Sequence, residues 1–228
     1  MGGYNASDRS HFLLAFGIAG LMARKPPTNP RKHASQARSR ATVDALVEAT
    51  ARILVRDGFE KTSTNRIAEI AGVSVGSLYQ YFPSKEALVV AVIERHNEEI
   101  MKIVRAAFVE VADMPIEKAV RRLVTAAIEA HHIDSNLHRV LAEQIPRSGQ
   151  LKEVEASNRE VHALVRAYLE SRRKEMRRID PDIAAFVCVS AIEAVAHNTV
   201  LGGAQMLTEK MVRTLVDETT RMVVGYLR

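Results

Sequence analysis

The chain has 228 residues, which is long enough for one large domain or for a small and a medium-sized one. Hydrophobic residues make up 47% of it and charged residues 26%, so it can bury a sizeable core. Aromatic residues make up only 5% and tryptophan is absent, which argues against a large aromatic-rich β architecture.

The positive charge is concentrated in the first part of the chain. Residues 1–95 hold 13 Lys and Arg against 8 Asp and Glu, whereas residues 96–228 hold 19 of each. The whole net charge of +5 therefore falls in the N-terminal part. This asymmetry is typical of a basic module that binds a polyanion, joined to a neutral module with another role, although five charges can also arise by chance.

Cysteine content and hydropathy indicate the compartment. Cys188 is the single cysteine, so an intrachain disulfide is excluded and a reducing cytoplasm is favoured. Because it lies in the apolar run 184–189, we expect a buried structural thiol rather than a redox sensor. We find no segment with the roughly 20 apolar residues that cross a bilayer, so we expect a cytoplasmic protein with no membrane partner.

The first 37 residues are predicted to lie outside the folded domains. Residues 12–22 resemble a short signal-peptide core, but no cleavage pattern follows them. We suspect that translation starts at Met22 and that residues 1–37 are a disordered or mis-started extension. Its basic arm, residues 23–38, holds five cations and no acid, and it either adds DNA contacts or is a solvated tail.

Three short helices are predicted next. Apolar residues recur at helical spacing over about 39–57, and Gly58 ends that helix. The hydroxyl run 62–64 can cap a second helix that ends at Gly72, where a residue without Cβ permits the chain to reverse. Ser74 can cap a third helix that continues to about Tyr81. Two short helices around a tight glycine turn have the sequence form of a helix-turn-helix.

Capping residues, prolines and glycines divide the remaining chain into six longer helices. The fourth begins after Ser84, the fifth after residues 113–115, and the sixth ends before residues 146–149. The seventh covers about 151–177, the eighth 181–201, and the ninth begins at Thr208. We therefore predict an all-α protein of about nine helices, with a DNA-binding domain at 38–85 and a second helical domain at 86–228. The cations at 172–178 are interpreted as a solvated helix end.

The helix-turn-helix segment resembles the DNA-binding signature of the TetR family of repressors. The shared pattern is T-x-x-I-A-x-x-A-G-V-S-x-G-x-L-Y-x-Y-F-x-x-K-x-x-L, and it begins at Thr64 and ends at Leu88. The resemblance covers about residues 38–95, and beyond them only length and helical layout match. It implies a repressor with an N-terminal DNA-binding domain and a C-terminal domain for ligand sensing and dimerisation.

The same resemblance implies which residues contact DNA. The uncharged outer face of the third helix would enter the major groove, with Lys85 and the second helix at the phosphates. The residues implied are Thr62, Thr64, Ser74, Gly76, Ser77, Tyr79, Tyr81 and Lys85. Two alternatives stay open: the tyrosines can pack against the first helix, and the threonines can cap a helix without touching DNA. Leu78 and Phe82 are expected in the core.

The eighth helix is apolar on most sides, so it must be buried on more than one face. Together with the ninth helix it is predicted to form a homodimer interface, which gives two DNA-reading heads, although both helices can instead belong to the monomer core. Polar residues within these apolar helices are candidates for an inducer site. They are His131, Glu143, Tyr168, Glu193, His197 and Asn198.

No cofactor or metal is predicted, because His131, Asp134 and His138 lack a diagnostic zinc spacing. The leading hypothesis is a repressor that a small-molecule inducer releases from a palindromic double-stranded operator. An all-helical enzyme is disfavoured because we find no nucleophile–base pair, phosphate loop or H-E-x-x-H motif. A non-specific architectural DNA protein is disfavoured by the neutral C-terminal two-thirds.

Overall fold

The structure is a computed structural model that describes residues 37–145, 151–202 and 208–228. These residues form nine α-helices, one short 3-10 helix and no strand, which confirms the all-α prediction. The expectations for residues 1–36 lie outside the described part. The helices are α1 Ala37–Asp57, α2 Thr64–Ala71, α3 Val75–Tyr81, α4 Lys85–Val111, α5 Ile116–His131, α6 Ser135–Gln144, α7 Leu151–Ser171, α8 Pro181–Leu201 and α9 Glu209–Leu227, and the 3-10 helix η3 is Arg173–Glu175.

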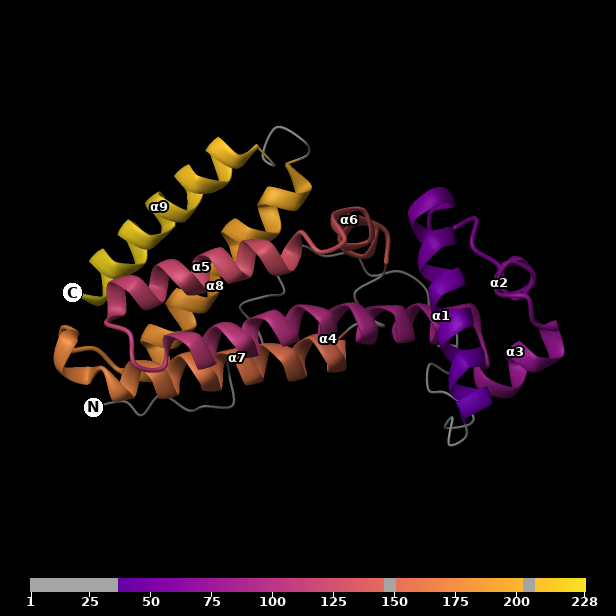
Figure 1. Cartoon of the computed structure of the whole chain (residues 1–228), viewed down its shortest axis with the longest axis horizontal. Coiled ribbons are helices and arrows are strands. Elements are labelled where there is room, and N and C mark those ends of the chain that lie inside the picture. The colour runs from indigo at the N-terminus through magenta and orange to yellow at the C-terminus, as the bar shows by residue number, and fades with distance from the viewer. Residues whose placement is uncertain (1–36, 146–150, 203–207) are drawn as a thin grey trace, which may run out of the picture.

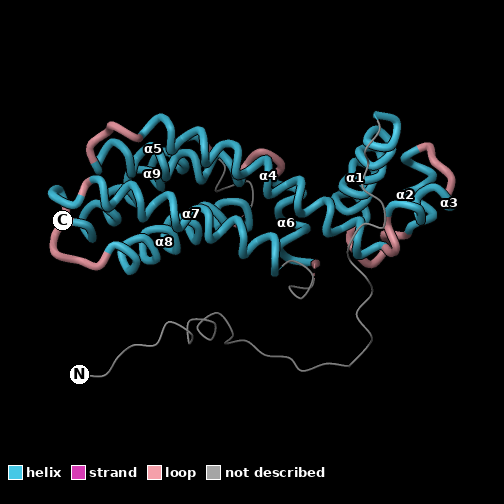
Figure 2. Tube along the Cα trace, turned by 90° about the horizontal axis from the view of Figure 1, so that it is seen from below, coloured by secondary structure: helices cyan, strands magenta, loops and turns pink. Residues whose placement is uncertain are grey.

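The molecule is elongated, with α1–α3 gathered at one end as an N-terminal head (Figure 1). The long helix α4 starts in the head and runs into a body made of α5, α7, α8 and α9. Figure 2 shows α7 and α8 side by side along one flank of the body. The C-terminus lies at the end of the body farthest from α2 and α3. One continuous helix therefore connects the two parts of the molecule.

The short helices of the head begin at side-chain caps. Ser63, Ser74 and Ser84 each accept a hydrogen bond from a backbone N–H in the first turn of α2, α3 and α4. Such a cap contributes about 1 kcal/mol by satisfying an N–H that has no partner within the helix. Three caps within 22 residues fix where the short helices start.

The apolar core of the head continues past the predicted domain border at residue 85. Its centre includes Leu46, Ile67, Leu78 and Phe82, each at most 1% exposed, which agrees with the core roles expected for Leu78 and Phe82. The same cluster takes in the first turns of α4 and the buried face of α6, namely Leu137, Leu141 and Ile145. Helix α6 is thus packed against the head although it lies some 50 residues later in the chain.

A second apolar core holds the body together. It joins residues of α5, α7, α8 and α9 and includes Ile116, Ile128 and Leu227, all nearly inaccessible. Cys188 is 4% exposed within it, and burial raises the pKa of its thiol to about 11, as expected for a structural cysteine.

Helix α8 corrects the expectation that no segment is apolar enough to cross a membrane. Its 21 residues are long and apolar enough to cross a membrane by length and composition alone, although 39% of its most apolar window is buried. It packs against α5, α7 and α9, which is the behaviour of a core helix of the body. Its hydropathy therefore reflects burial on several faces.

The cations after α7 are also placed differently from the prediction. Helix α7 ends at Ser171, and the following residues form η3 and a loop. Arg172 donates to the Ala112 carbonyl, and Arg177 donates to the Tyr226 carbonyl and covers the Tyr226 ring. The predicted helix end was too late, but four of the five cations are exposed to solvent as expected, and Arg172 and Arg177 also bind backbone carbonyls.

Candidate DNA-binding surface and ligand cavity

The turn between α2 and α3 fixes how α3 is presented. Gly72 has a φ of 67°, in the left-handed region, and its N–H donates to the Glu69 carbonyl. The next N–H, that of Val73, donates to the Ala68 carbonyl, which closes α2. Ile67 and Ala68 of α2 and Leu78 of α3 are buried together. The opposite face of α3 consequently points to solvent at the tip of the molecule (Figure 1).

The outer face of α3 is polar and uncharged. Ser74 and Gly76 are exposed, Ser77 is half-buried, and Tyr79 is 41% exposed. The Ser74 hydroxyl accepts from the Ser77 N–H and also bonds the Ser77 hydroxyl at 2.9 Å. The Tyr79 hydroxyl lies 3.0 Å from the Thr64 hydroxyl, so α2 and α3 join their hydroxyls at one edge. Hydroxyls held in this way can donate to phosphates or to base edges.

Three of the residues implied as DNA contacts have partners inside the head. Thr62 is 3% exposed and its hydroxyl donates to the Gly58 carbonyl at 2.7 Å, so this hydroxyl is engaged within the head and its phosphate contact stays a prediction. The cap of α2 is Ser63 instead. Tyr81 is 8% exposed and donates to the Ser39 hydroxyl, so its ring packs against α1. Lys85 donates to the Phe59 carbonyl and lies over the Phe59 ring.

The surface beside α3 contains cations that the motif did not indicate. An open groove next to α2 is lined by Arg56, Ser63, Asn65, Arg66, Glu69 and Ile70. Arg66 pairs with Asp57 at 3.4 Å, and a hydrogen bond from Arg56 lowers the pKa of the Asp57 carboxyl. Arg38 and Arg40 are exposed at the start of α1, on either side of the Ser39 that Tyr81 contacts. Only their positive charge could have suggested them in the sequence.

The body contains an apolar cavity that is partly open to solvent. It lies between α4, α5, α7, α8 and α9, and its wall includes Val104 and Phe108 of α4. Two of the predicted ligand residues, Tyr168 and Glu193, line it. The Tyr168 hydroxyl donates to the Met114 carbonyl at 2.8 Å, and burial raises its pKa. Glu193 is the one acidic residue in the described wall.

The other four predicted ligand residues do not line the cavity. Glu143 is exposed near the end of α6, and Asn198 is exposed and donates to the Ala194 carbonyl, so both lie outside this cavity and their ligand role stays a prediction. The side chains of Glu143 and Asn198 point outward from their helices. Apolar periodicity could not predict this in helices that are apolar on several sides. His131 is buried behind Glu193, with its Nε2 3.4 Å from the carboxylate. His197 lies outside the cavity, in a group of histidines that also includes His131.

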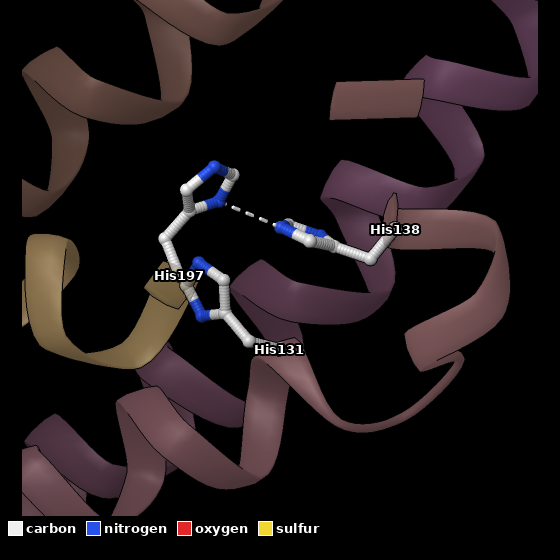
Figure 3. A group of neighbouring side chains, drawn as sticks. All are labelled: His131, His138 and His197. Carbon is white, nitrogen blue, oxygen red and sulfur yellow. Dashed lines mark hydrogen bonds between the residues drawn. The ribbon is translucent and has the colours of Figure 1, made fainter. Parts of the chain in front are cut away.

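Four histidines meet where α4, α5, α6 and α8 converge. His138 Nδ1 lies 3.0 Å from His96 Nε2, and His138 Nε2 lies 2.9 Å from His197 Nδ1 (Figure 3). Burial, together with the neighbouring histidines, lowers the pKa of His138 to about 3. Burial lowers the pKa of His131 as well, but the hydrogen bond and charge of Glu193 and the Ala127 carbonyl outweigh this and raise it. His138 is therefore neutral at pH 7.

Comparison with known proteins identifies both parts of the chain. Residues 46–92 match the sequence model described as bacterial regulatory proteins of the tetR family. Residues 115–227 match the tetracyclin repressor-like C-terminal domain. The chain belongs to the TetR family. The resemblance in the helix-turn-helix is thus confirmed and extends to the body, and the family is one of transcriptional regulators rather than enzymes.

Curated relatives match over a limited part of the chain. The chain is 43% identical over 55 residues to the transcriptional repressor KstR of Mycolicibacterium smegmatis, which is 24% of this chain and 27% of that protein. It is 40% identical over 68 residues, 30% of each chain, to the transcriptional regulator RutR of Escherichia coli. The matched part spans about a quarter to a third of the length of these relatives.

Solved structures extend the likeness to the whole fold. The fatty acid degradation regulator FadR of Bacillus halodurans aligns with a TM-score of 0.62 at 18% identity, over 81% of this chain and 99% of that one. A TetR-family regulator from Mesorhizobium loti aligns with a TM-score of 0.66 at 18% identity, over 83% and 98%. The TetR architecture is thus preserved while the residues of the body differ.

Proposed function

We propose that this chain is a cytoplasmic, homodimeric transcriptional repressor that binds a palindromic operator through α3. The observation that carries the proposal is the exposed hydroxyl-rich face of α3 at the tip of the molecule, beside Arg38, Arg40 and Arg66. An uncharged helix flanked by cations suits a duplex, whose base edges carry hydrogen-bonding groups and whose backbone carries charge. The partner is double-stranded DNA, and no catalytic role is assigned.

The dimer is proposed to form through α8 and α9. Ile183 and Phe186 on α8 are 53% and 59% exposed, and Met211 and Met222 on α9 are 38% and 52% exposed. Large apolar side chains gathered on two helices of one body are typical of a protein interface. A two-fold dimer places two α3 helices on one face of the duplex, and this symmetry favours a palindrome.

The cavity is proposed to bind the inducer, a mainly apolar small molecule. Glu193 would disfavour a ligand that places a free carboxylate beside it, because two like charges in an apolar wall repel each other. A neutral or hydrogen-donating group at that end suits the site better. The fold shared with FadR of Bacillus halodurans is compatible with an acyl chain, provided that its polar end is esterified or faces away from Glu193.

Helix α4 offers a direct route from the cavity to the head. Val104 and Phe108 line the cavity, while Leu88 of the same helix is buried in the head core. A ligand that fills the cavity would displace α4 and with it the orientation of α3. Such coupling requires that the ligand bind one arrangement of the two heads more tightly than the other.

The proposal is tested by selecting bound sequences from a random pool of double-stranded DNA with the purified full chain. We expect one palindrome, and its affinity should fall steeply as salt concentration rises, because bound phosphates release counterions. Tyr79→Ala should weaken binding about tenfold, which is the loss of one good hydrogen bond, while Val109→Ala, at a 79% exposed position of α4, should not. Recovery of no preferred sequence would contradict the proposal.

A further inference from the structure

We infer that His131, His138 and His197 form a binding site for a divalent transition-metal ion of the zinc class. The three side chains come from α5, α6 and α8 and turn toward one another (Figure 3). One ligand atom from each lies within 4.8 Å of the other two. His131 is buried and the other two are half-buried, so this is an interior site and not a chance meeting of surface side chains.

The hydrogen bonds around the rings place one nitrogen of each ring toward the centre. His131 Nδ1 donates to the Ala127 carbonyl at 2.8 Å, so Nε2 is the ligand atom, and it gives up any proton that it shares with Glu193 when a metal binds. His138 Nδ1 can donate to His96 Nε2, and His138 Nε2 then accepts from His197 Nδ1. The proton of His197 moves to its Nε2 when Nδ1 binds a metal. Second hydrogen bonds of this kind commonly orient metal-bound imidazoles.

The distances fit a zinc-class ion after small movements. Zinc–nitrogen bonds of about 2.0–2.1 Å in a tetrahedral site place their nitrogens about 3.3–3.4 Å apart. The pair His138 Nε2 and His197 Nδ1, now 2.9 Å apart, would open by about 0.5 Å. No two of the three ligand atoms are more than 4.8 Å apart. The largest closing movement required is therefore about 1.4 Å, which is within the reach of side-chain rotation.

Glu193 lies beside the three histidines and supplies negative charge. Its Oε2 is 3.4 Å from His131 Nε2, and it stands four residues before His197 on α8, so both side chains leave the same face of the helix. Three imidazoles are ligands that zinc, cobalt or nickel prefer, whereas magnesium and calcium prefer oxygen alone. Arg139, the cation next to His138, is committed to the Val200 carbonyl.

His96, which contacts His138, is itself incompletely hydrogen-bonded. Among the described residues, its Nδ1 is a buried nitrogen with no hydrogen-bond partner. Buried polar atoms normally find partners, so the histidines do not form a self-contained hydrogen-bond network, although this nitrogen is not one of the three ligands. The site goes beyond the proposed repressor, because metal binding requires neither DNA nor the inducer.

The test uses the untagged full chain after treatment with a chelator. Zn²⁺ is titrated in competition with a chromogenic chelator, and Co²⁺ is titrated while its visible spectrum is recorded. We expect one ion per chain, an intense tetrahedral Co²⁺ spectrum, a raised melting temperature with Zn²⁺, and no binding of Mg²⁺ at the same concentration. Failure of the wild-type chain to bind one ion with this spectrum would overturn the site.

The variants His138→Gln and His197→Gln each remove one ligand from a different helix. Both should weaken Zn²⁺ binding by more than about 100-fold. Loss of a residue that only hydrogen-bonds to a metal ligand costs about 10–100-fold in affinity, so the larger loss identifies a direct ligand. The matched control is His162→Gln, because His162 lies on α7, stacks on Phe186 and is not one of the three ligands. Helicity, measured by circular dichroism, identifies any variant that does not fold. Undiminished binding in either folded variant would also overturn the site.

Discussion

Gly76 illustrates how one residue of α3 can separate stability from DNA binding. A Cβ added at this helical position would meet only the Ser74 hydroxyl, at 3.9 Å. Gly76→Ala should therefore raise the free energy of unfolding by up to about 1 kcal/mol, because alanine is the better helix former. The same methyl group stands on the face proposed to meet DNA, so operator affinity should fall.

Urea denaturation measures the expected rise in the free energy of unfolding of Gly76→Ala. A DNA-binding titration of the same sample measures the expected fall in operator affinity. The control is Gly72→Ala, where a φ of 67° should cost about 1–2 kcal/mol whatever the space around it. A more stable Gly76→Ala protein with unchanged operator affinity would show that α3 meets DNA elsewhere.

Cys188 provides a probe of the cavity wall. Its thiol pKa of about 11, against an ordinary 9.0, leaves about 100-fold less thiolate at pH 8 than a free cysteine has. Alkylation of the native protein should be slower than that of the urea-unfolded chain by at least this factor, and should accelerate about tenfold per pH unit up to pH 10. Labelling followed by mass spectrometry measures both rates. Equal rates in the native and unfolded chains would contradict burial.

Residue types alone could not place every candidate side chain. The caps at Ser63, Ser74 and Ser84 follow from local rules, because a helix start needs an oxygen acceptor within its own segment. The burial of Thr62 depends instead on the Gly58 carbonyl, and that of Tyr81 on how α3 meets α1. Such facts depend on the packing of segments that are distant in sequence.

At the level of elements, α6 connects the head to the body. Gln144 accepts a hydrogen bond from the Phe59 N–H at 3.1 Å, and Leu141 is buried in the head core. Gln144→Ala should speed hydrogen exchange at the Phe59 amide and lower the free energy of unfolding by about 1 kcal/mol. NMR or mass-resolved exchange measures the first effect and denaturation the second.

A matched change at α6 is Glu143→Ala, which alters the exposed neighbour of Gln144. It should leave exchange at the Phe59 amide unaltered. Equal exchange in the wild type and in Gln144→Ala would mean that the head does not depend on this contact.

The number and order of helices could be predicted because prolines, glycines and capping residues mark their ends. What α6 touches could not be predicted, since an amphipathic stripe indicates that a face is buried but not against which partner. The end of α7 was placed six residues late for a related reason. The cations after Ser171 are compatible with a helix, but their hydrogen bonds to distant carbonyls form a loop instead.

The whole molecule has its DNA-reading tip and its proposed dimer helices in different parts of an elongated fold, so dimerisation can be tested separately from DNA contact (Figure 1). Phe186→Asp places a charge where a 59% exposed aromatic ring is proposed to be buried by a second copy. We expect the dimer dissociation constant to rise by at least about 30-fold, the loss of a 2 kcal/mol hot spot. Sedimentation over a range of concentrations measures it.

Operator affinity should fall in the same Phe186→Asp variant, because a monomer reads only half of a palindrome and loses the second set of phosphate contacts. The matched control is Val109→Asp, the same kind of change at a 79% exposed residue of α4 outside α8 and α9. That variant should remain dimeric and bind the operator normally. If Phe186→Asp stays dimeric at the concentrations where the wild type does, the two copies associate through another surface. The positions of the two α3 helices on the duplex must then be derived from that surface.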